Sequence, residues 1–319
     1  METHQQNLLA RLIVSALFTA VMAGAWDAWW HAAIGRETFW EPPHLLLYSA
    51  VTVAISAGIY GWYKTKEKIW RRLAIILALV PLSAPFDDLW HRIFGVENIS
   101  SPLIVWSPPH LVLIGAIAAS FIGLLPLIRR DRDITAQRFF GGLSLAAILN
   151  LLLFVAAPVQ PMGPYELIGF WGAGIVAFLL AGAFLVASRW MPGVAGATLV
   201  AAFFLVISAI GFGEEIAPGV IIQPHDHPPA WLTIFSILIV ATFIDVAKLK
   251  PMWLSGALAG VLWSGIFYSF SSMFFKLEFQ YTAGDTGVAV FASLIGGVVA
   301  GFFVSKFYKK EFAVKEKPR

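Results

Sequence analysis

The chain has 319 residues, of which 59% are hydrophobic and only 13% charged, and its formal net charge is +3. A water-soluble domain normally carries about twice that share of charged residues, so the composition excludes an ordinary soluble globular protein. The chain has no cysteine, which excludes disulfides and thiolate-bound metals, and it has no basic face or phosphate-binding glycine loop that would predict a nucleic-acid partner.

Apolar runs of about 20 residues follow one another along the whole chain, whose mean hydropathy is +0.77. No alternating ten-residue segments of the kind that form transmembrane strands are present. The sequence therefore predicts an all-α, polytopic transmembrane helical bundle of about ten spans, arranged as five helical hairpins, whose first helix is retained. The expected spans are approximately 7–31, 43–63, 70–91, 109–128, 136–157, 166–188, 194–214, 229–248, 252–275 and 286–307.

The basic residues predict how these spans are oriented. All of the 22 Lys and Arg residues except Arg36, Arg92 and Lys276 fall at the termini or in the loops on one side of the spans. Cytoplasmic loops are enriched in Lys and Arg, so we expect both termini in the cytoplasm of a multi-pass plasma-membrane protein. The five hairpin tips then lie at the outer face.

The first two hairpins carry the same polar motif, D-x-x-W-H-x-x-x-G-x-E, followed after a variable gap by W-x-P-P-H-L-x-L. The two copies cover residues 27–47 and 87–113. Chance alone would hardly produce both, so the motif indicates an internal duplication. We expect a duplicated metal-binding hairpin pair over 1–130, followed by additional transmembrane hairpins of the same membrane domain over 131–319.

Each copy offers one Asp and two His. The Asp and the first His are four residues apart, so they share one face of a helix, and the second His follows a Pro-Pro pair that suits a helix start. Ionisable groups at the end of an apolar helix normally face a partner, a cavity or an ion. An Asp with two His can hold a transition metal and leave coordination positions open. The predicted ligands are Asp27, His31 and His44 in the first copy, and Asp87, His91 and His110 in the second.

Other acidic and His residues at the hairpin tips are candidates for further ligands or for groups that orient the imidazoles. A polar network without metal, in which the Asp–His pairs only hold helix ends together, is the alternative interpretation of all these residues. These further candidates are Glu37, Glu97, Asp88, Glu214, Glu215, His225 and His227.

The ordered pair of triplets resembles the metal-binding motif of the C-type, copper-site subunit of copper membrane monooxygenases, the particulate methane and ammonia monooxygenases. The resemblance covers the first two hairpins, about a third of the chain. The second triplet has Asp where the family has Asn, and a longer gap to its last His. The resemblance implies membrane-embedded copper, activation of O2 and an enzyme that depends on partner subunits.

The leading functional hypothesis is an oxygenase-type membrane subunit that binds copper and acts on a small apolar substrate. Iron and zinc remain alternative metals. The alternative function is a non-catalytic membrane metal carrier, sensor or cofactor-assembly protein. The expected partners are the lipid bilayer and either other membrane subunits or further copies of the chain.

Overall fold

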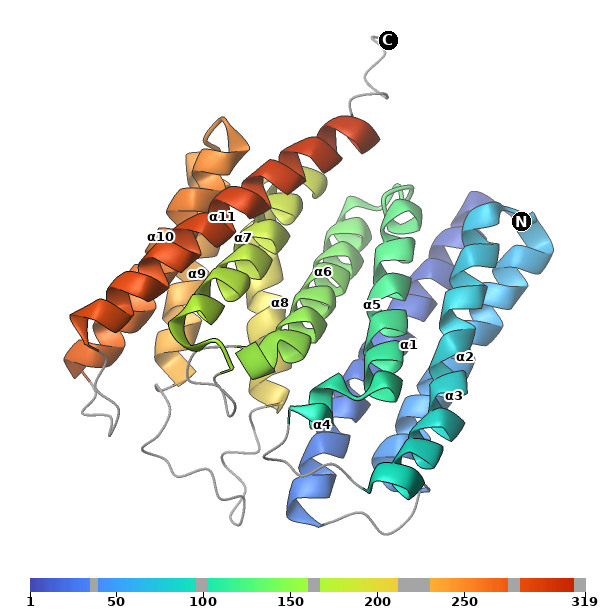
Figure 1. Cartoon of the computed structure of the whole chain (residues 1–319). Coiled ribbons are helices and arrows are strands. Elements are labelled where there is room, and N and C mark those ends of the chain that lie inside the picture. The colour runs from blue at the N-terminus through green and yellow to red at the C-terminus, as the bar shows by residue number, and fades with distance from the viewer. Residues whose placement is uncertain (35–39, 96–101, 160–166, 212–229, 275–281, 313–319) are drawn as a thin grey trace, which may run out of the picture. The chain divides into compact units, whose positions relative to one another are not determined.

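The structure is a computed structural model that describes every residue except 35–39, 96–101, 160–166, 212–229, 275–281 and 313–319. Within the described residues the chain is helical and has no strand (Figure 1). The α-helices are α1 (Thr3–Ala33), α2 (Pro42–Thr65), α3 (Lys68–Phe94), α4 (Leu103–Trp106), α5 (Pro108–Ile128), α6 (Ile134–Ala156), α7 (Gly172–Trp190), α8 (Gly196–Gly211), α9 (Ala230–Ala247), α10 (Met252–Phe274) and α11 (Ala283–Phe312). Two short 3-10 helices, η1 (Ala157–Val159) and η2 (Gly169–Trp171), precede α7.

Eight of the described helices are long and apolar enough to cross a bilayer, namely α1, α2, α3, α5, α6, α7, α10 and α11. The shorter apolar helices α8 and α9 lie on either side of residues 212–229, which the structure does not describe. In a bilayer every backbone polar group must be paired inside the protein, and a helix achieves this within one segment. The structure therefore confirms a helical, multi-pass membrane protein.

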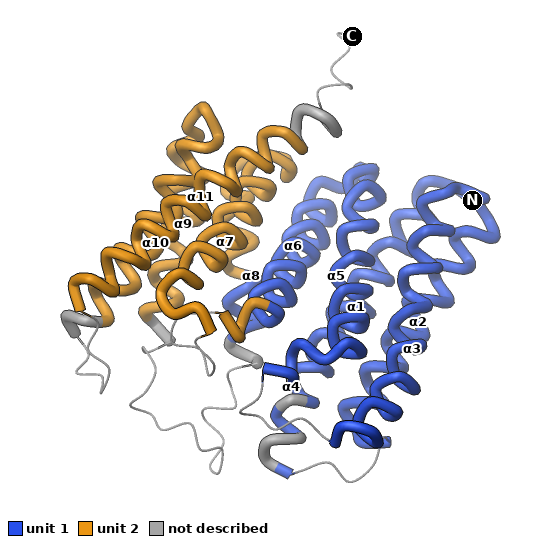
Figure 2. The backbone as a smooth tube through the Cα atoms, viewed as in Figure 1, with its two compact units in different colours: residues 1–155, 203–221 blue, residues 156–202, 222–319 orange. Residues whose placement is uncertain are grey.

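The chain divides into two compact units (Figure 2). Unit 1 contains residues 1–155 and 203–221, and unit 2 contains residues 156–202 and 222–319. Helix α8 begins in unit 2 and ends in unit 1.

In unit 1, helices α1, α2, α3 and α5 form a closed ring in which each packs against the next and α5 packs against α1. Its core is made of large apolar side chains, including Leu17, Leu77 and Phe121, which are fully buried. Neighbouring helices of this ring run antiparallel. The C-terminal ends of α1 and α3 therefore lie at the same end as the N-terminal ends of α2 and α5 (Figure 1).

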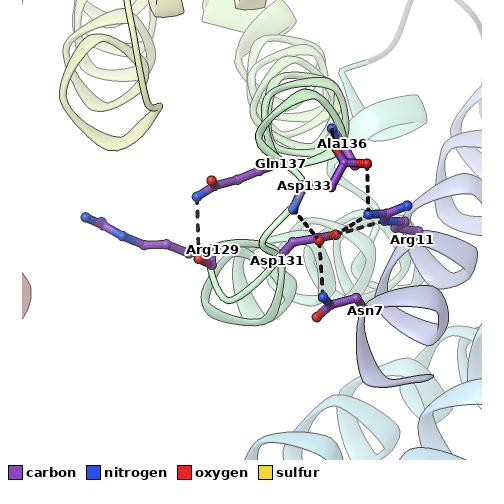
Figure 3. Close-up of polar contacts among 7 residues, drawn as sticks. All are labelled: Asn7, Arg11, Arg129, Asp131, Asp133, Ala136 and Gln137. Carbon is purple, nitrogen blue, oxygen red and sulfur yellow. Dashed lines mark hydrogen bonds and ion pairs between the residues drawn. The ribbon is translucent and has the colours of Figure 1, made fainter. Parts of the chain in front are cut away.

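The opposite end of unit 1 is held by a polar network that joins α1 to the turn between α5 and α6 (Figure 3). Arg11 pairs with Asp131 at 2.7 Å, and the Asn7 side chain donates to the other oxygen of the same carboxylate at 3.1 Å. Asp133 accepts the Ala136 backbone N–H at 3.1 Å in the first turn of α6. Buried polar groups are thus satisfied across two segments of sequence that lie far apart.

In unit 2, helices α7, α10 and α11 pack against one another, and α9 packs against α7 and α10. Glycines let α10 and α11 approach closely, because a Cβ on Gly256 would meet the Gly297 carbonyl oxygen and a Cβ on Gly260 would meet that of Ser293. Asp245 on α9 accepts the backbone N–H groups of Ala197 and Thr198, which fixes the start of α8.

Candidate metal centre

Asp87, His91 and His110, here called cluster B, come together at the end of unit 1 where α3 ends and α5 begins. The Nε2 atom of His91 lies 3.2 Å from Asp87 Oδ1, and the Nε2 atom of His110 lies 3.3 Å from the same oxygen. The two imidazole rings are 6.1 Å apart between centroids and tilted by 57°. The side chains of Asp87 and His91 are largely buried, and His110 is somewhat more exposed.

Local structure explains why these three side chains meet. Asp87 and His91 are one turn apart near the end of α3, and His110 lies in the first turn of α5, which begins at the Pro108-Pro109 pair. Trp106 precedes that pair and donates its indole N–H to the Val155 carbonyl oxygen at 2.8 Å, which holds the start of α5 in place.

Gly95 completes the end of α3 in a conformation that requires glycine. Its φ of 81° and ψ of 168° lie in a region that side-chain-bearing residues rarely adopt. The Gly95 N–H donates to the His91 carbonyl oxygen at 2.9 Å, and the Gly95 carbonyl oxygen lies 3.4 Å from His91 Nδ1. A carbonyl at Nδ1 favours a proton on that nitrogen, which leaves the Nε2 lone pair as the one that can bind a metal.

Asp27, Glu41 and His44, here called cluster A, form a second group at the same end of unit 1. The Nε2 atom of His44 lies 3.1 Å from Asp27 Oδ1, and a carboxylate oxygen of Glu41 completes the group. Asp27 is near the end of α1, while Glu41 and His44 flank the Pro42-Pro43 pair that starts α2. His31 lies in α1, but its side chain is outside the described residues.

Sequence reasoning missed Glu41 as a candidate ligand. Only 5% of its surface is exposed, which is rare for a Glu unless it has polar or ionic neighbours. The available signal was its place in the motif W-x-P-P-H, where it precedes the Pro pair and stands three residues before His44. The shared motif leaves this position unspecified, because the second copy has Ser107 there.

The remaining predicted candidates do not join either cluster within the described residues. Asp88 is not a member of cluster B and pairs with Arg92 at 2.7 Å, and its side chain is 41% exposed. The others lie outside the described residues: Glu37, Glu97, Glu214, Glu215, His225 and His227.

In each cluster the three ligand atoms lie within 4.8 Å of one another. Metal–nitrogen and metal–oxygen bonds are about 2.0–2.2 Å long, so small side-chain movements would bring all three atoms onto one ion. Three protein ligands leave at least one coordination position open, which is typical of catalytic rather than structural sites.

A groove of about 370 Å³ lies on α2 directly beside cluster A. The groove is open, and most of its lining surface is apolar. The lining residues are Trp40, His44, Leu45, Tyr48, Ser49 and Thr52. No protein-family model, curated protein or solved structure matches the chain.

Proposed function

We propose that this membrane protein binds one transition-metal ion in each of clusters A and B. The observation that carries the proposal is the convergence of His91 Nε2 and His110 Nε2 on a single oxygen of Asp87. An ion pair that only holds two helix ends together needs one imidazole per carboxylate. Two imidazoles from different helices, aimed at one point beside a carboxylate, have the arrangement of metal ligands.

An internal duplication accounts for the likeness of the two clusters. Asp27 and Asp87 each lie near the end of an apolar helix, and His44 and His110 each follow a Pro-Pro pair at the start of the next. Each Asp–His contact between helices is of similar length, 3.1 Å in cluster A and 3.3 Å in cluster B. Equivalent residues in equivalent places support one ancestral hairpin that was copied, within a chain of five such hairpins.

Copper is the metal that we assign where imidazole ligands predominate, with iron and zinc as alternatives. Imidazole suits all three, and copper binds such nitrogen and oxygen sites most tightly among the first-row divalent ions. The resemblance of the two triplets to the C-type subunit of copper membrane monooxygenases points to the same metal.

The clusters lie at the outer face of the plasma membrane, with both termini in the cytoplasm. Arg11, Lys64, Lys68 and Arg129 mark the ends of α1, α2, α3 and α5 that are opposite to the clusters. Because positive charge is retained on the cytoplasmic side, this distribution supports an outward orientation of the clusters.

The activity that we propose is that of an oxygenase-type subunit, in which bound copper supplies the chemistry of O2 activation. The resemblance of the two triplets to the C-type subunit of copper membrane monooxygenases supports this activity, and an open groove lies on α2 beside His44. Tyr48 contributes to the groove and stacks edge-on to His44 at 6.4 Å between ring centroids, which limits how the imidazole can turn.

Mass spectrometry of the metal content tests the proposal. The protein is purified in detergent after growth with added metals. We expect about one ion per cluster, with loss of metal as the pH falls, because ligand imidazoles must be neutral to bind. Less than about a tenth of an equivalent of any transition metal would contradict metal binding.

Exposure of the metal-loaded protein to O2 separates an oxygenase from the alternative functions. A carrier, sensor or assembly protein binds metal but forms no oxygen-derived species.

A further inference from the structure

The two copies of the motif carry different residues immediately before the Pro-Pro pair. Glu41 precedes the Pro-Pro pair of α2, whereas Ser107 precedes that of α5. Both residues occupy the N-cap of their helix, and neither makes a side-chain capping bond to it. One carboxylate oxygen of Glu41 lies within 4.8 Å of the ligand atoms of Asp27 and His44. Among the described residues, cluster A therefore has two carboxylates and cluster B has one.

The surroundings make this difference in charge important. Glu41 and Ser107 are both buried, and both clusters lie at the ends of apolar helices. An uncompensated charge in such a place is costly, so each cluster favours an ion that balances its ligands. Two carboxylates balance a divalent ion. One carboxylate with two neutral imidazoles balances a monovalent ion.

Ligand hardness acts in the same direction as charge. Carboxylate oxygens suit hard divalent ions such as Mn²⁺, whereas imidazole nitrogens suit softer ions such as copper. Cluster A has carboxylates for two of its three described ligands, and cluster B has imidazoles for two of three.

We propose that the two centres select different ions: cluster A holds a hard divalent ion, and cluster B holds copper, which its charge stabilises as Cu(I). The inference rests on the proposed function, since it requires that both clusters bind metal. Glu41 is the residue that sets the difference.

The test is a pair of titrations of the purified protein in detergent. Mn²⁺ binding is followed by electron paramagnetic resonance, and Cu(I) binding is followed by competition with a coloured chelator under anaerobic conditions. The wild-type protein is expected to bind one Mn²⁺ at cluster A and one Cu(I) at cluster B. Glu41→Ser should weaken Mn²⁺ binding by roughly tenfold or more and leave Cu(I) binding unchanged. His110→Ala should do the reverse.

Two further variants separate loss of charge from loss of folding. Glu41→Gln keeps the size of the side chain, so weaker Mn²⁺ binding with an unchanged unfolding temperature would isolate the effect of charge. Ser107→Glu should create a second Mn²⁺ site at cluster B, a gain that misfolding cannot produce.

The outcomes distinguish this inference from the proposed function. Equal Mn²⁺ affinities in the wild type, Glu41→Ser and Glu41→Gln, in protein that still binds metal, would overturn the inference alone. If the wild-type protein bound neither ion, the proposed function would fail and the inference would fail with it.

Discussion

Asp87 and Asp88 are neighbouring carboxylates with different surroundings, and this difference gives a sharp test at the scale of single residues. Asp87 is in contact with two imidazoles, whereas Asp88 is partly exposed and paired with Arg92. We predict that Asp87→Asn lowers the metal bound at cluster B by roughly tenfold or more at limiting metal concentration. Asp88→Asn should retain the wild-type metal content, measured by mass spectrometry on the same preparation. Equal losses in both variants would show that cluster B is not the binding site.

Gly95 is predicted to support His91 through the backbone. Gly95→Ala would force a side chain into a conformation with φ of 81°, although a Cβ there meets no atom within 4 Å. The cost is therefore conformational, about 1–3 kcal/mol of unfolding free energy, and the His91 ring should lose its orientation along with metal affinity. Thermal unfolding in detergent measures the first effect and metal titration the second. The control is Gly115→Ala in α5, which has equal space but no positive φ and should not destabilise the protein.

The site residues show where sequence reasoning succeeds and where it stops at this scale. Helical spacing places Asp87 beside His91, and the structure brings His110 to the same carboxylate oxygen. Glu41 could not be predicted from a repeat, because the copies differ at that position. Comparing two copies draws attention to the residues that they share, whereas the burial of Glu41 beside Asp27 depends on how α1 and α2 pack.

At the scale of helices, the network around Asp131 should be important for stability. Asp131 is buried and accepts bonds from Arg11 and Asn7. Asp131→Ala would leave a partly buried guanidinium without its carboxylate, so we predict a loss of about 3 kcal/mol in unfolding free energy. The exposed pair between Glu67 and Arg130, at 2.9 Å, is the control. Glu67→Gln should cost less than about 1 kcal/mol. Similar shifts of the unfolding temperature in the two variants would contradict this role of Asp131.

Close packing between α10 and α11 gives a second prediction at this scale. Gly256→Ala would push a methyl group against the Gly297 backbone and should destabilise the protein by about 1–3 kcal/mol. Gly265→Ala in the same helix meets nothing within 4 Å, so it should be neutral or slightly stabilising. Unfolding in detergent compares the two. A variant Gly256→Ala as stable as Gly265→Ala would show that α10 and α11 do not pack through these glycines.

The positions of the helices could be predicted well, because particular residues mark where they begin. The Pro42-Pro43 and Pro108-Pro109 pairs predict helix starts, and α2 and α5 begin at Pro42 and Pro108. The short helix α4 was not predicted, because four residues carry no periodic signal. The partner of each helix is harder to predict, since uniformly apolar surfaces have no face that marks a neighbour. The G-x-x-x-G spacing of Gly256 with Gly260, and of Gly297 with Gly301, was a usable signal for the α10–α11 contact.

For the whole molecule, the orientation in the membrane is the feature to test, and the absence of native cysteine makes the test clean. Ile34 is half exposed at the cluster end of α1, and Arg132 is exposed at the opposite end of unit 1. We predict that a membrane-impermeant maleimide added to intact cells labels Ile34→Cys but not Arg132→Cys. Opening the membrane should make both react. Labelling of Arg132→Cys alone in intact cells would reverse the orientation and place both clusters on the cytoplasmic side.

Composition accounts for how much of the whole molecule was predictable. A chain this apolar must pair its backbone groups within helices, so the fold class follows from hydropathy. The division into two compact units does not follow, because no polar linker in the sequence separates residues 1–155 from 156–202. Which helices group together is decided by packing details such as the glycine contacts of unit 2.

The most direct test of metal binding is X-ray absorption at the absorption edge of each bound metal. The purified wild-type protein is compared with the double variant Asp27→Asn, Asp87→Asn. For the wild-type protein we predict nitrogen and oxygen neighbours at about 2.0–2.1 Å, with the outer-shell scattering that imidazole rings produce. The double variant should lose this signal, because it lacks the Asp carboxylate of each cluster. A spectrum that is identical in the two proteins, or a wild-type protein with no metal edge at all, would contradict the account.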